Sequence, residues 1–218
     1  MVKIFSVEGN IGSGKSTLVN ILKDAYKTNP NIIFMQEPVD DWLEFKDKDG
    51  ETIITKFYSD QKKYAFSFQM MAYISRISKL KKLVKSVEDN PRAIIICERC
   101  VLTDRNVFAK MLYHDNKIDD INYQIYNAWF DEFIEDIPID GLVYVKAEPE
   151  ISFNRVTKRN REGETIPLEY LKNCNDYHNN WINNENIKVL TLDANTDFDY
   201  NLNDYKEWID SINSFIIL

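Results

Sequence analysis

The chain has 218 residues, of which 44% are hydrophobic, and a formal net charge of −8 at pH 7. This length and composition suit a single domain over residues 1–218 with a full core, and they exclude a disordered tail. The acidic balance disfavours binding to a nucleic-acid polymer, because such binding depends on neutralising backbone phosphates.

Short continuous runs rich in Ile and Val predict strands that are buried on both faces of a parallel sheet. The five predicted strands are residues 3–7, 32–36, 93–98, 142–146 and 188–192. The helical stretches between and after them are residues 15–27, 60–87, 103–113, 121–134, 148–158, 168–183 and 203–215. This alternation predicts a doubly wound α/β fold with a five-stranded parallel sheet flanked by helices.

The first predicted strand is followed by the pattern GxxxxGK[ST] and then by a helix, which is the context that a phosphate-binding P-loop needs. The candidate phosphate-binding residues are Gly9, Asn10, Ile11, Gly12, Ser13, Gly14, Lys15, Ser16 and Thr17. In such a loop, backbone N–H groups and the helix N-terminus bind phosphate oxygens. We expect Lys15 to reach the β- and γ-phosphates of a nucleoside triphosphate and Ser16 to bind Mg²⁺.

The third predicted strand ends in an acidic residue, Glu98. Because neighbouring strands of a parallel sheet end at one crevice, we expect Glu98 near the metal ion, directly or through water. The loop and this carboxylate predict a triphosphate site, but they do not identify the group that receives the phosphate.

Three cysteines, Cys97, Cys100 and Cys174, cannot form an even set of disulfides. Their number favours a reducing compartment, so we expect a cytoplasmic protein. No apolar run approaches 18 residues, and the N-terminus has no basic region before its apolar strand. We therefore expect neither secretion nor a membrane span.

Four motifs occur in order along the chain. They are residues 8–17 around the phosphate loop, Gln36-Glu37-Pro38-Val39-Asp40-Asp41-Trp42, Cys97-Glu98-Arg99-Cys100 with Asp104-Arg105, and Arg155-x-x-x-Arg159-x-Arg161. Together they resemble the deoxynucleoside kinases of the deoxycytidine, deoxyguanosine and insect multisubstrate type. The resemblance runs from Ile4 to about Phe198. It implies transfer of a phosphoryl group from ATP, with Mg²⁺, to the 5′-hydroxyl of a deoxynucleoside in nucleotide salvage.

Glu37 is the candidate general base. A carboxylate at the end of the second strand can accept the proton of the attacking hydroxyl. The resemblance implies this role for Glu37, and it implies that Arg99 holds Glu37 and the substrate 5′-oxygen in place. The family usually has Ser where this chain has Cys100, so a secondary hydroxyl donor is missing here.

An arginine-rich lid is expected at about residues 155–166. Arginine side chains match phosphate oxygens and can neutralise charge that develops during transfer, which makes Arg159 and Arg161 candidate catalytic residues. Arg155 is a candidate donor-binding residue. The resemblance implies that Phe198 packs on the donor adenine.

One face of the helix at residues 60–87 carries Gln69, Ala72 and Arg76. A Gln amide offers a donor and an acceptor together, which suits the edge of a base. The resemblance implies that Gln69 reads that edge. The other residues that it assigns to the nucleoside are Phe108, which stacks on the base, Tyr58 and Glu164 at the sugar 3′-hydroxyl, and Ile11, Val39, Trp42, Phe57 and Phe68 in the pocket wall.

The resemblance also places Arg76 beside Asp104, next to the base. A carboxylate there can accept a hydrogen bond from the exocyclic amine of cytosine or adenine but repels the carbonyl of thymine. We therefore expect deoxycytidine and the purine deoxynucleosides as substrates, with thymidine poor.

Two alternatives remain open at this stage. One is a nucleoside monophosphate kinase of the thymidylate kinase type, although such an enzyme needs an arginine to clamp the acceptor's phosphate, and Glu37 at that place favours an uncharged acceptor. The other is a non-catalytic nucleotide-binding switch, although the chain has no guanine-reading NKxD-like motif. The resemblance further implies a homodimer, formed through the helices at residues 60–87 and 121–134.

Overall fold

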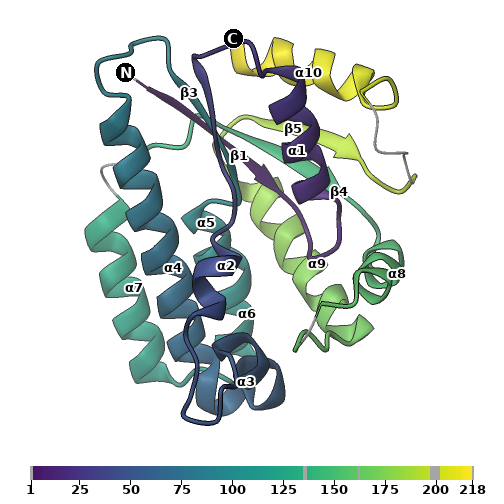
Figure 1. The fold of residues 1–218 in the computed structure, drawn as a ribbon. Helices are drawn as coiled ribbons and strands as arrows, with labels where there is room; N and C mark the ends of the chain where they lie inside the picture. The colour runs from purple at the N-terminus through teal and green to yellow at the C-terminus, as the bar shows by residue number, and fades with distance from the viewer. Residues whose placement is uncertain (1, 135–136, 162, 197–201, 218) are drawn as a thin grey trace.

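The computed structural model describes residues 2–134, 137–161, 163–196 and 202–217. Within them, five parallel strands form one sheet in the order β2-β3-β1-β4-β5 (Figure 1). The strands are β1 (Lys3–Glu8), β2 (Ile32–Met35), β3 (Ile94–Glu98), β4 (Gly141–Lys146) and β5 (Val189–Asp193). The predicted parallel sheet and doubly wound α/β fold are thereby confirmed.

Two hydrophobic cores cover the two faces of the sheet, because successive strand residues point to opposite faces. On one face, Ile4 and Ile95 pack with the helices α4 (Gln61–Ser86), α7 (Asp120–Ile134) and α9 (Leu168–Asn184). On the other face, Phe5, Ile96 and Val143 pack with the helices α1 (Lys15–Ala25) and α10 (Lys206–Ile217). Continuous apolar strands are therefore what this sandwich of helices and sheet requires.

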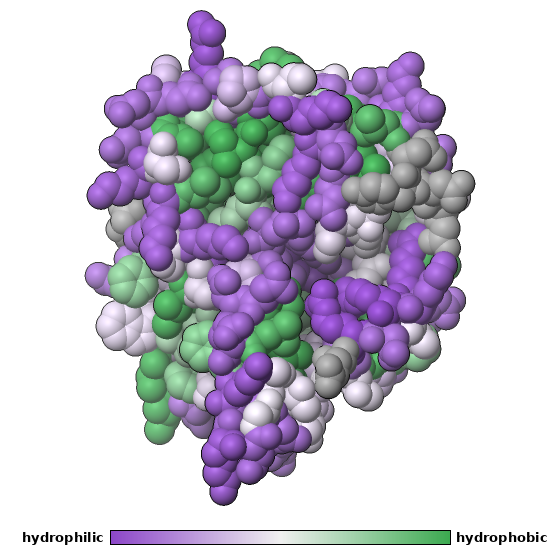
Figure 2. All heavy atoms as spheres, viewed as in Figure 1, coloured by the Kyte–Doolittle hydropathy of each residue, from purple (hydrophilic) through white to green (hydrophobic). Residues whose placement is uncertain are grey.

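β2 is an edge strand, and three of its four residues are only half-buried. Figure 2 shows a hydrophobic patch in this region, between α4 and α1, on a surface that is otherwise largely hydrophilic. A strand paired on one side only is expected to be less covered than the central strands.

The helix predicted at residues 103–113 is not regular. The chain forms a short helix α5 (Val101–Thr103), a π-helical segment η1 (Asp104–Ala109) and then α6 (Lys110–His114). π-helical turns often mark functional sites, and this one begins at a residue assigned to the base pocket. A pattern of apolar residues does not distinguish a π-helical turn from an α-helical one.

Two further helices, α2 (Val39–Leu43) and α3 (Ile53–Ser59), were not expected. The side chain of Thr52 caps α3 by accepting a hydrogen bond from the Thr55 N–H at 3.2 Å. Both helices are too short for hydrophobic periodicity to reveal them. They follow the second strand and form one wall of the site described below.

The helix α8 (Pro149–Arg159) agrees with the predicted helix at residues 148–158.

Cys97, Cys100 and Cys174 are all free and buried, as expected for a chain without disulfides. No helix in the described ranges has both the length and the apolarity needed to cross a bilayer.

Candidate active site

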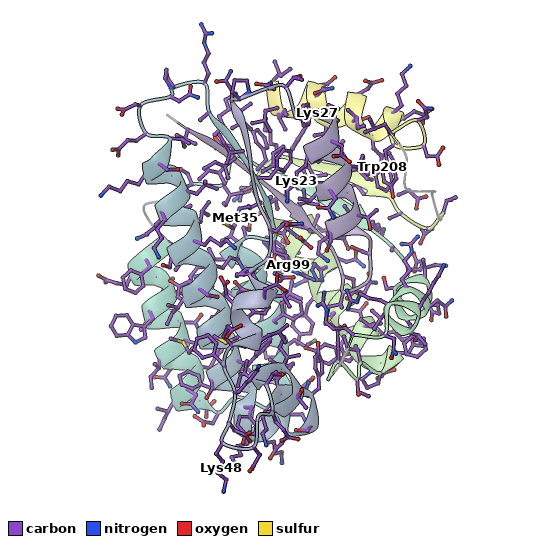
Figure 3. The ribbon with its side chains drawn as sticks, in the orientation of Figure 1. Lys23, Lys27, Met35, Lys48, Arg99 and Trp208 are labelled. Atoms are coloured by element: carbon purple, nitrogen blue, oxygen red, sulfur yellow. The ribbon has the colours of Figure 1, made fainter. Side chains whose placement is uncertain are left out.

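The carboxyl ends of β1, β2 and β3 meet at a cavity of about 800 Å³. Its walls come from the phosphate loop, from α2, α3 and α4, from η1, and from α8 and α10. Arg99, one of its residues, lies near the centre of the molecule (Figure 3). A crevice beyond the carboxyl ends of parallel strands is the usual ligand site of this fold class.

The phosphate loop adopts the tight turn that its glycines predict. Gly9 and Gly12 have φ of 145° and 80°, where side chains are disfavoured. A Cβ on Gly9 would lie 2.4 Å from the Val145 carbonyl oxygen, so this glycine is also needed for close packing. The predicted loop residues from Ile11 to Thr17 line the cavity, whereas Gly9 and Asn10 shape the loop from behind.

Lys15 is buried, and its Nζ donates a hydrogen bond to the Asn10 carbonyl at 2.6 Å. Burial and, to a lesser extent, the nearby Arg99 lower its pKa from 10.5 to about 7, against the opposing effect of Glu37, Glu98 and Glu8. Near neutral pH the loop therefore holds an amine that is only partly charged, and a negative ligand would favour its charged form.

Ser16 and Glu98 lie together at the end of β3, where the Ser16 hydroxyl donates a hydrogen bond to Glu98 Oε1. The described residues contain no group of three or more His, Cys, Asp or Glu side chains that could hold a metal ion. Mg²⁺ usually takes one or two protein oxygens and completes its shell with phosphates and water. The hydroxyl and carboxylate present here fit that pattern.

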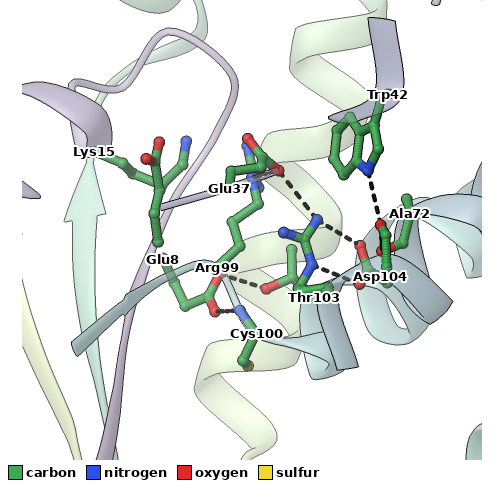
Figure 4. A network of polar contacts seen from close by, with 12 residues as sticks. Glu8, Lys15, Glu37, Trp42, Ala72, Arg99, Cys100, Thr103 and Asp104 are labelled. Carbon is green, nitrogen blue, oxygen red and sulfur yellow. Dashed lines mark hydrogen bonds and ion pairs between the residues drawn. The ribbon is translucent and has the colours of Figure 1, made fainter. Parts of the chain in front are cut away.

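Glu37 lies two residues beyond the end of β2 at Met35, so it does not end the strand as predicted. Its Oε1 accepts a hydrogen bond from Arg76 Nη2 at 3.1 Å and lies 3.3 Å from Arg99 Nε (Figure 4). Burial alone would raise the pKa of Glu37, but Arg99, Arg76 and Lys15 outweigh it and hold the pKa below its usual range. Glu37 is therefore ionised and fixed in orientation by two arginines.

Arg76 also holds Asp104, with Nε to Oδ2 at 2.9 Å and Nη2 to Oδ1 at 3.1 Å. Both residues are almost fully buried, with side chains 1% and 2% exposed. This bidentate pair of hydrogen bonds joins α4 to η1 beside the cavity. The predicted neighbourhood of Arg76 and Asp104 is present.

The residues assigned to the nucleoside come together in the cavity wall. They are Ile11, Glu37, Val39, Trp42, Phe57, Tyr58, Phe68, Gln69, Ala72, Arg76, Arg99, Asp104, Phe108 and Glu164. The rings of Phe57 and Phe68 stack at 4.5 Å, and Trp42 meets Phe68 edge-on at 5.7 Å. This end of the cavity is thus a slot lined by aromatic rings.

Gln69 projects a polar group into this aromatic slot. The residue is only 2% exposed, and its Oε1 has no hydrogen-bond partner among the described residues. Buried polar atoms are normally satisfied, so an unpartnered amide oxygen in a cavity wall indicates a ligand that supplies a donor. A Gln amide offers a donor and an acceptor together, which is the chemistry needed for the expected role of Gln69 at the edge of a base.

The lid arginines also line the cavity. Arg159 donates a hydrogen bond to Glu164, and Arg161 Nη1 lies 3.8 Å from the same carboxylate. Arg155 Nη1 donates to the Ser13 carbonyl at 3.3 Å and thus reaches the phosphate loop. Phe198, assigned to the donor adenine, lies outside the described residues.

Several cavity-lining residues were not predicted as site residues, among them Ile54, Tyr170, Ala194, Thr196, Tyr205 and Trp208. Tyr205 and Trp208 meet edge-on at 5.5 Å, near the start of α10. Aromatic residues at helical spacing read as core packing, and only the fold places these two at the cavity. Their aromatic character was the one signal that could have singled them out.

The fold and the site define a nucleotide-binding phosphotransferase with a P-loop. The sequence model of the deoxynucleoside kinase family matches residues 5–217. The chain therefore belongs to the deoxynucleoside kinase family, and it is a kinase that phosphorylates deoxynucleosides.

Known relatives agree with this membership. The chain is 33% identical to deoxycytidine kinase 1 of Xenopus laevis, over 99% of this chain and 91% of that protein. It is 38% identical to a probable deoxycytidine kinase of Fowlpox virus, over 91% and 80%. It is also 30% identical to the mitochondrial deoxyguanosine kinase of Xenopus laevis, over 92% and 84%.

Proposed function

We propose that the enzyme transfers the γ-phosphoryl group of ATP to the 5′-hydroxyl of a deoxynucleoside and so forms a deoxynucleoside monophosphate for salvage. The observation that carries this proposal is the position of Glu37, which two arginines fix in the same cavity as Lys15 and the Ser16–Glu98 pair. A base, a phosphate-binding loop and a candidate metal site are thus combined in one crevice.

In this reaction the bond between the 5′-oxygen and the γ-phosphorus forms, and the bond from that phosphorus to the β,γ-bridging oxygen breaks. Glu37 accepts the hydroxyl proton, while Arg99 orients both Glu37 and the 5′-oxygen. Mg²⁺, held through Ser16 and Glu98, would neutralise charge on the triphosphate. ADP leaves from the phosphate loop.

Charge that develops on the transferred group is matched by cations on both sides. Lys15 approaches the transferred group from the loop, and Arg159 and Arg161 approach it from the lid at residues 155–166. Arg155 binds the donor and links the lid to the loop. Within one domain over residues 1–218, the lid and the loop thus close on the same phosphates.

The nucleoside occupies the aromatic slot in this proposal. Gln69 reads the edge of the base, and Phe108 stacks on it. Tyr58 and Glu164 bind the sugar 3′-hydroxyl. The two side chains lie close enough that the charge of Glu164, after burial, raises the pKa of Tyr58. The slot therefore accepts an uncharged sugar with its base.

Deoxycytidine and the purine deoxynucleosides are the proposed preferred substrates. Asp104 accepts hydrogen bonds from Arg76 and can accept another from an exocyclic amine, which thymine lacks. The Arg76 side chain also takes up the space that a thymine methyl group would need. The two relatives named as deoxycytidine kinases and the deoxyguanosine kinase support this choice.

Phosphorylation of the four deoxynucleosides with ATP and Mg²⁺ tests the proposal directly, with product monophosphates separated by chromatography. Deoxycytidine and at least one purine deoxynucleoside should be converted, and thymidine poorly. The four monophosphates serve as alternative acceptors. Conversion of monophosphates alone would contradict the proposal and favour the thymidylate kinase type, and tight nucleotide binding without any product would favour a switch.

The proposal includes a homodimer, formed by a second copy of the chain against α4 and α7. These helices lie side by side on one flank of the molecule (Figure 1). They carry large hydrophobic residues that are exposed to solvent, namely Ile74, Ile121, Ile125, Trp129 and Phe133. A contiguous apolar surface of this kind supports an interface.

The three free buried thiols support a reducing compartment, the cytoplasm.

A further inference from the structure

Glu8 is a buried carboxylate that the reaction described above does not use. It is the last residue of β1, directly before the phosphate loop, and none of its surface is exposed. Among the described residues it has no ion-pair partner, whereas Glu37 and Asp104 both have arginines. A buried carboxylate without a cation is unfavourable unless hydrogen bonds compensate for its lost hydration.

Three neutral donors supply that compensation. Glu8 Oε1 accepts from the Ser6 hydroxyl at 2.5 Å and from the Cys100 backbone N–H at 2.8 Å. Glu8 Oε2 accepts from the Thr103 hydroxyl (Figure 4). Two of the three donors thus lie on another part of the chain, more than 90 residues away, so Glu8 joins β1 to the segment that follows β3.

That segment, residues 99–104, needs such a support. Arg99 has a φ of 61°, a left-handed conformation that a residue with a side chain adopts only when its surroundings enforce it. The Arg99 N–H donates to the Val7 carbonyl at 3.0 Å, and the next N–H, of Cys100, donates to Glu8. The unfavourable turn is therefore held from β1 at two successive residues.

Both supports of Glu37 start from this segment. Arg99, at its beginning, contacts Glu37 directly. Asp104, at its end and next to Thr103, fixes Arg76, which in turn donates to Glu37. The carboxylate of Glu8 accepts hydrogen bonds from Cys100, directly after Arg99, and from Thr103, directly before Asp104. The positions of Arg99 and of Asp104, and through them both contacts to Glu37, therefore depend on the two oxygens of Glu8.

We propose that Glu8 is a positioning residue for phosphoryl transfer: it fixes residues 99–104 against the phosphate loop and thereby sets Glu37 relative to Lys15. This inference rests on the proposed role of Glu37 as the base. A role of Glu8 in folding alone is the competing explanation, and it predicts loss of stability without a specific effect on turnover.

Two matched substitutions separate these explanations. Thr103→Val removes the hydroxyl that links Glu8 to the segment, while Ser6→Ala removes a hydroxyl that binds the same carboxylate from within β1. With deoxycytidine and ATP, Thr103→Val should lower kcat by roughly 10- to 100-fold at little-changed KM, as expected for a misplaced base. Ser6→Ala should leave kcat close to wild type. Should Thr103→Val fail to fold, Thr103→Ala severs the same bond.

The pH dependence of kcat gives a measurement that a loss of stability alone would not change. If residues 99–104 shift, Arg99 and Arg76 hold Glu37 less closely and its pKa rises. The acid limb of the profile should therefore move to higher pH in Thr103→Val and stay in place in Ser6→Ala. Glu8→Gln should retain most of the activity, because its amide accepts from Cys100 and donates to the Thr103 hydroxyl.

Equal kcat in Thr103→Val and Ser6→Ala would overturn the proposal, as would an unshifted acid limb or a pure rise in KM. Loss of activity in Glu8→Gln as large as in Thr103→Val would also overturn it, because the charge of Glu8 would then act by itself. Wild-type enzyme is measured in parallel. Its failure to phosphorylate deoxycytidine would refute the proposed substrate rather than the role of Glu8.

Discussion

Glu37 combines two properties that conflict in a free carboxylic acid. A good base should bind a proton tightly, yet Arg99, Arg76 and Lys15 lower the pKa of Glu37 and so weaken it as a base. What they provide instead is a carboxylate that is ionised at neutral pH and aimed in one direction. The arginines therefore keep Glu37 in the form that can accept the hydroxyl proton and hold its oxygen in one direction.

Glu37→Gln should therefore retain nucleoside binding and lose turnover. The amide keeps the shape of the side chain but cannot accept the hydroxyl proton, so kcat should fall by roughly 10²- to 10⁴-fold. Steady-state kinetics with deoxycytidine measure kcat, and calorimetry measures nucleoside affinity. Asp40→Asn, an exposed acid that also lines the cavity, is the matched control. Near-normal turnover of Glu37→Gln would show that another group accepts the proton.

Lys15 leads to a prediction about protons and donor binding. Its pKa of about 7 means that most of the amine is neutral at pH 8, while a bound triphosphate would stabilise the charged form. Donor binding at pH 8 should therefore take up protons, and affinity should fall as pH rises above 7. Calorimetry in buffers of different ionisation enthalpy measures this uptake. Lys15→Met should abolish it, and equal uptake in that variant would contradict the assignment.

At this scale, the sequence could predict residues that belong to a local pattern. The loop, Glu37, Glu98 and the arginines each sit in a short motif, and the cavity brings them together. Glu8 also sits in a motif, but its hydrogen bonds to Cys100 and Thr103 depend on how β1 and β3 pair. Tyr205 and Trp208 reach the cavity only because α10 packs back on the sheet.

Among the elements, α4 and η1 depend on each other through a buried ion pair. Burial raises the pKa of Asp104, and the charge of Arg76 opposes that effect. The π-helical turn places Asp104 at the point where the long helix α4 passes the cavity. The pair is thus both a structural link between two helices and part of the cavity wall, where we propose that it faces the base.

Replacing both members of the pair should change the substrate. Arg76→Met with Asp104→Ala removes both charges and opens room, so the efficiency on thymidine relative to deoxycytidine should rise by roughly one to two decades, while loss of the Arg76 contact to Glu37 lowers turnover on both. Arg76→Met alone leaves the buried Asp104 carboxylate without its arginine and should destabilise the fold by about 3–5 kcal/mol, whereas Asp104→Ala alone leaves Arg76 paired with Glu37 and should cost less. Kinetics on thymidine and deoxycytidine, with thermal unfolding, measure both effects. Equal efficiency on the two nucleosides in the unaltered enzyme would refute this role of the pair.

The lid should affect catalysis more than binding. Arg159 and Arg161 are held by Glu164 in the structure, and phosphate oxygens would compete for them when the donor binds. Arg159→Ala and Arg161→Ala should each lower kcat more than they raise the nucleoside KM, because charge on the phosphoryl group changes in the transition state. Lys172→Ala removes one positive charge from α9, outside the cavity wall, and is the control. A change in nucleoside KM alone would contradict this role.

The elements that the sequence predicted well are the five strands and the long helices. All five strands were placed within two residues, because a parallel sheet covered on both faces demands continuous apolar runs. The helices α2 and α3 escaped prediction because tertiary contacts and a Thr52 cap, rather than an apolar stripe, define them. The π-helical turn escaped because its extra residue per turn leaves no compositional mark.

On the scale of the whole molecule, an acidic body surrounds a basic site. The net charge is −8, yet the cavity wall gathers Lys15, Arg76, Arg99 and the cations of the lid. Such a local cluster attracts a triphosphate, while the acidic surface around it repels a longer polyanion. The charge pattern therefore supports the proposed donor, a small phosphorylated ligand, rather than a nucleic-acid polymer.

The last prediction concerns assembly through α4 and α7. Trp129 on α7 is 50% exposed, and its ring stacks on that of Phe133 at 5.7 Å, so the two form an aromatic pair within the apolar surface. Large aromatic side chains of this kind commonly dominate the energy of an interface. Sedimentation at micromolar concentration should give a particle of about 51 kDa, which is twice the chain mass of 25.7 kDa.

Trp129→Glu should convert this particle into a monomer, because it places two opposing carboxylates in an apolar interface related by twofold symmetry. Phe45→Glu is the matched control, since Phe45 is 57% exposed but lies in the connection between α2 and α3, away from α7. It introduces the same charge in place of another exposed aromatic ring and should leave the dimer intact. A wild-type particle of 25.7 kDa would refute the dimer, and dissociation by both variants would place the interface elsewhere.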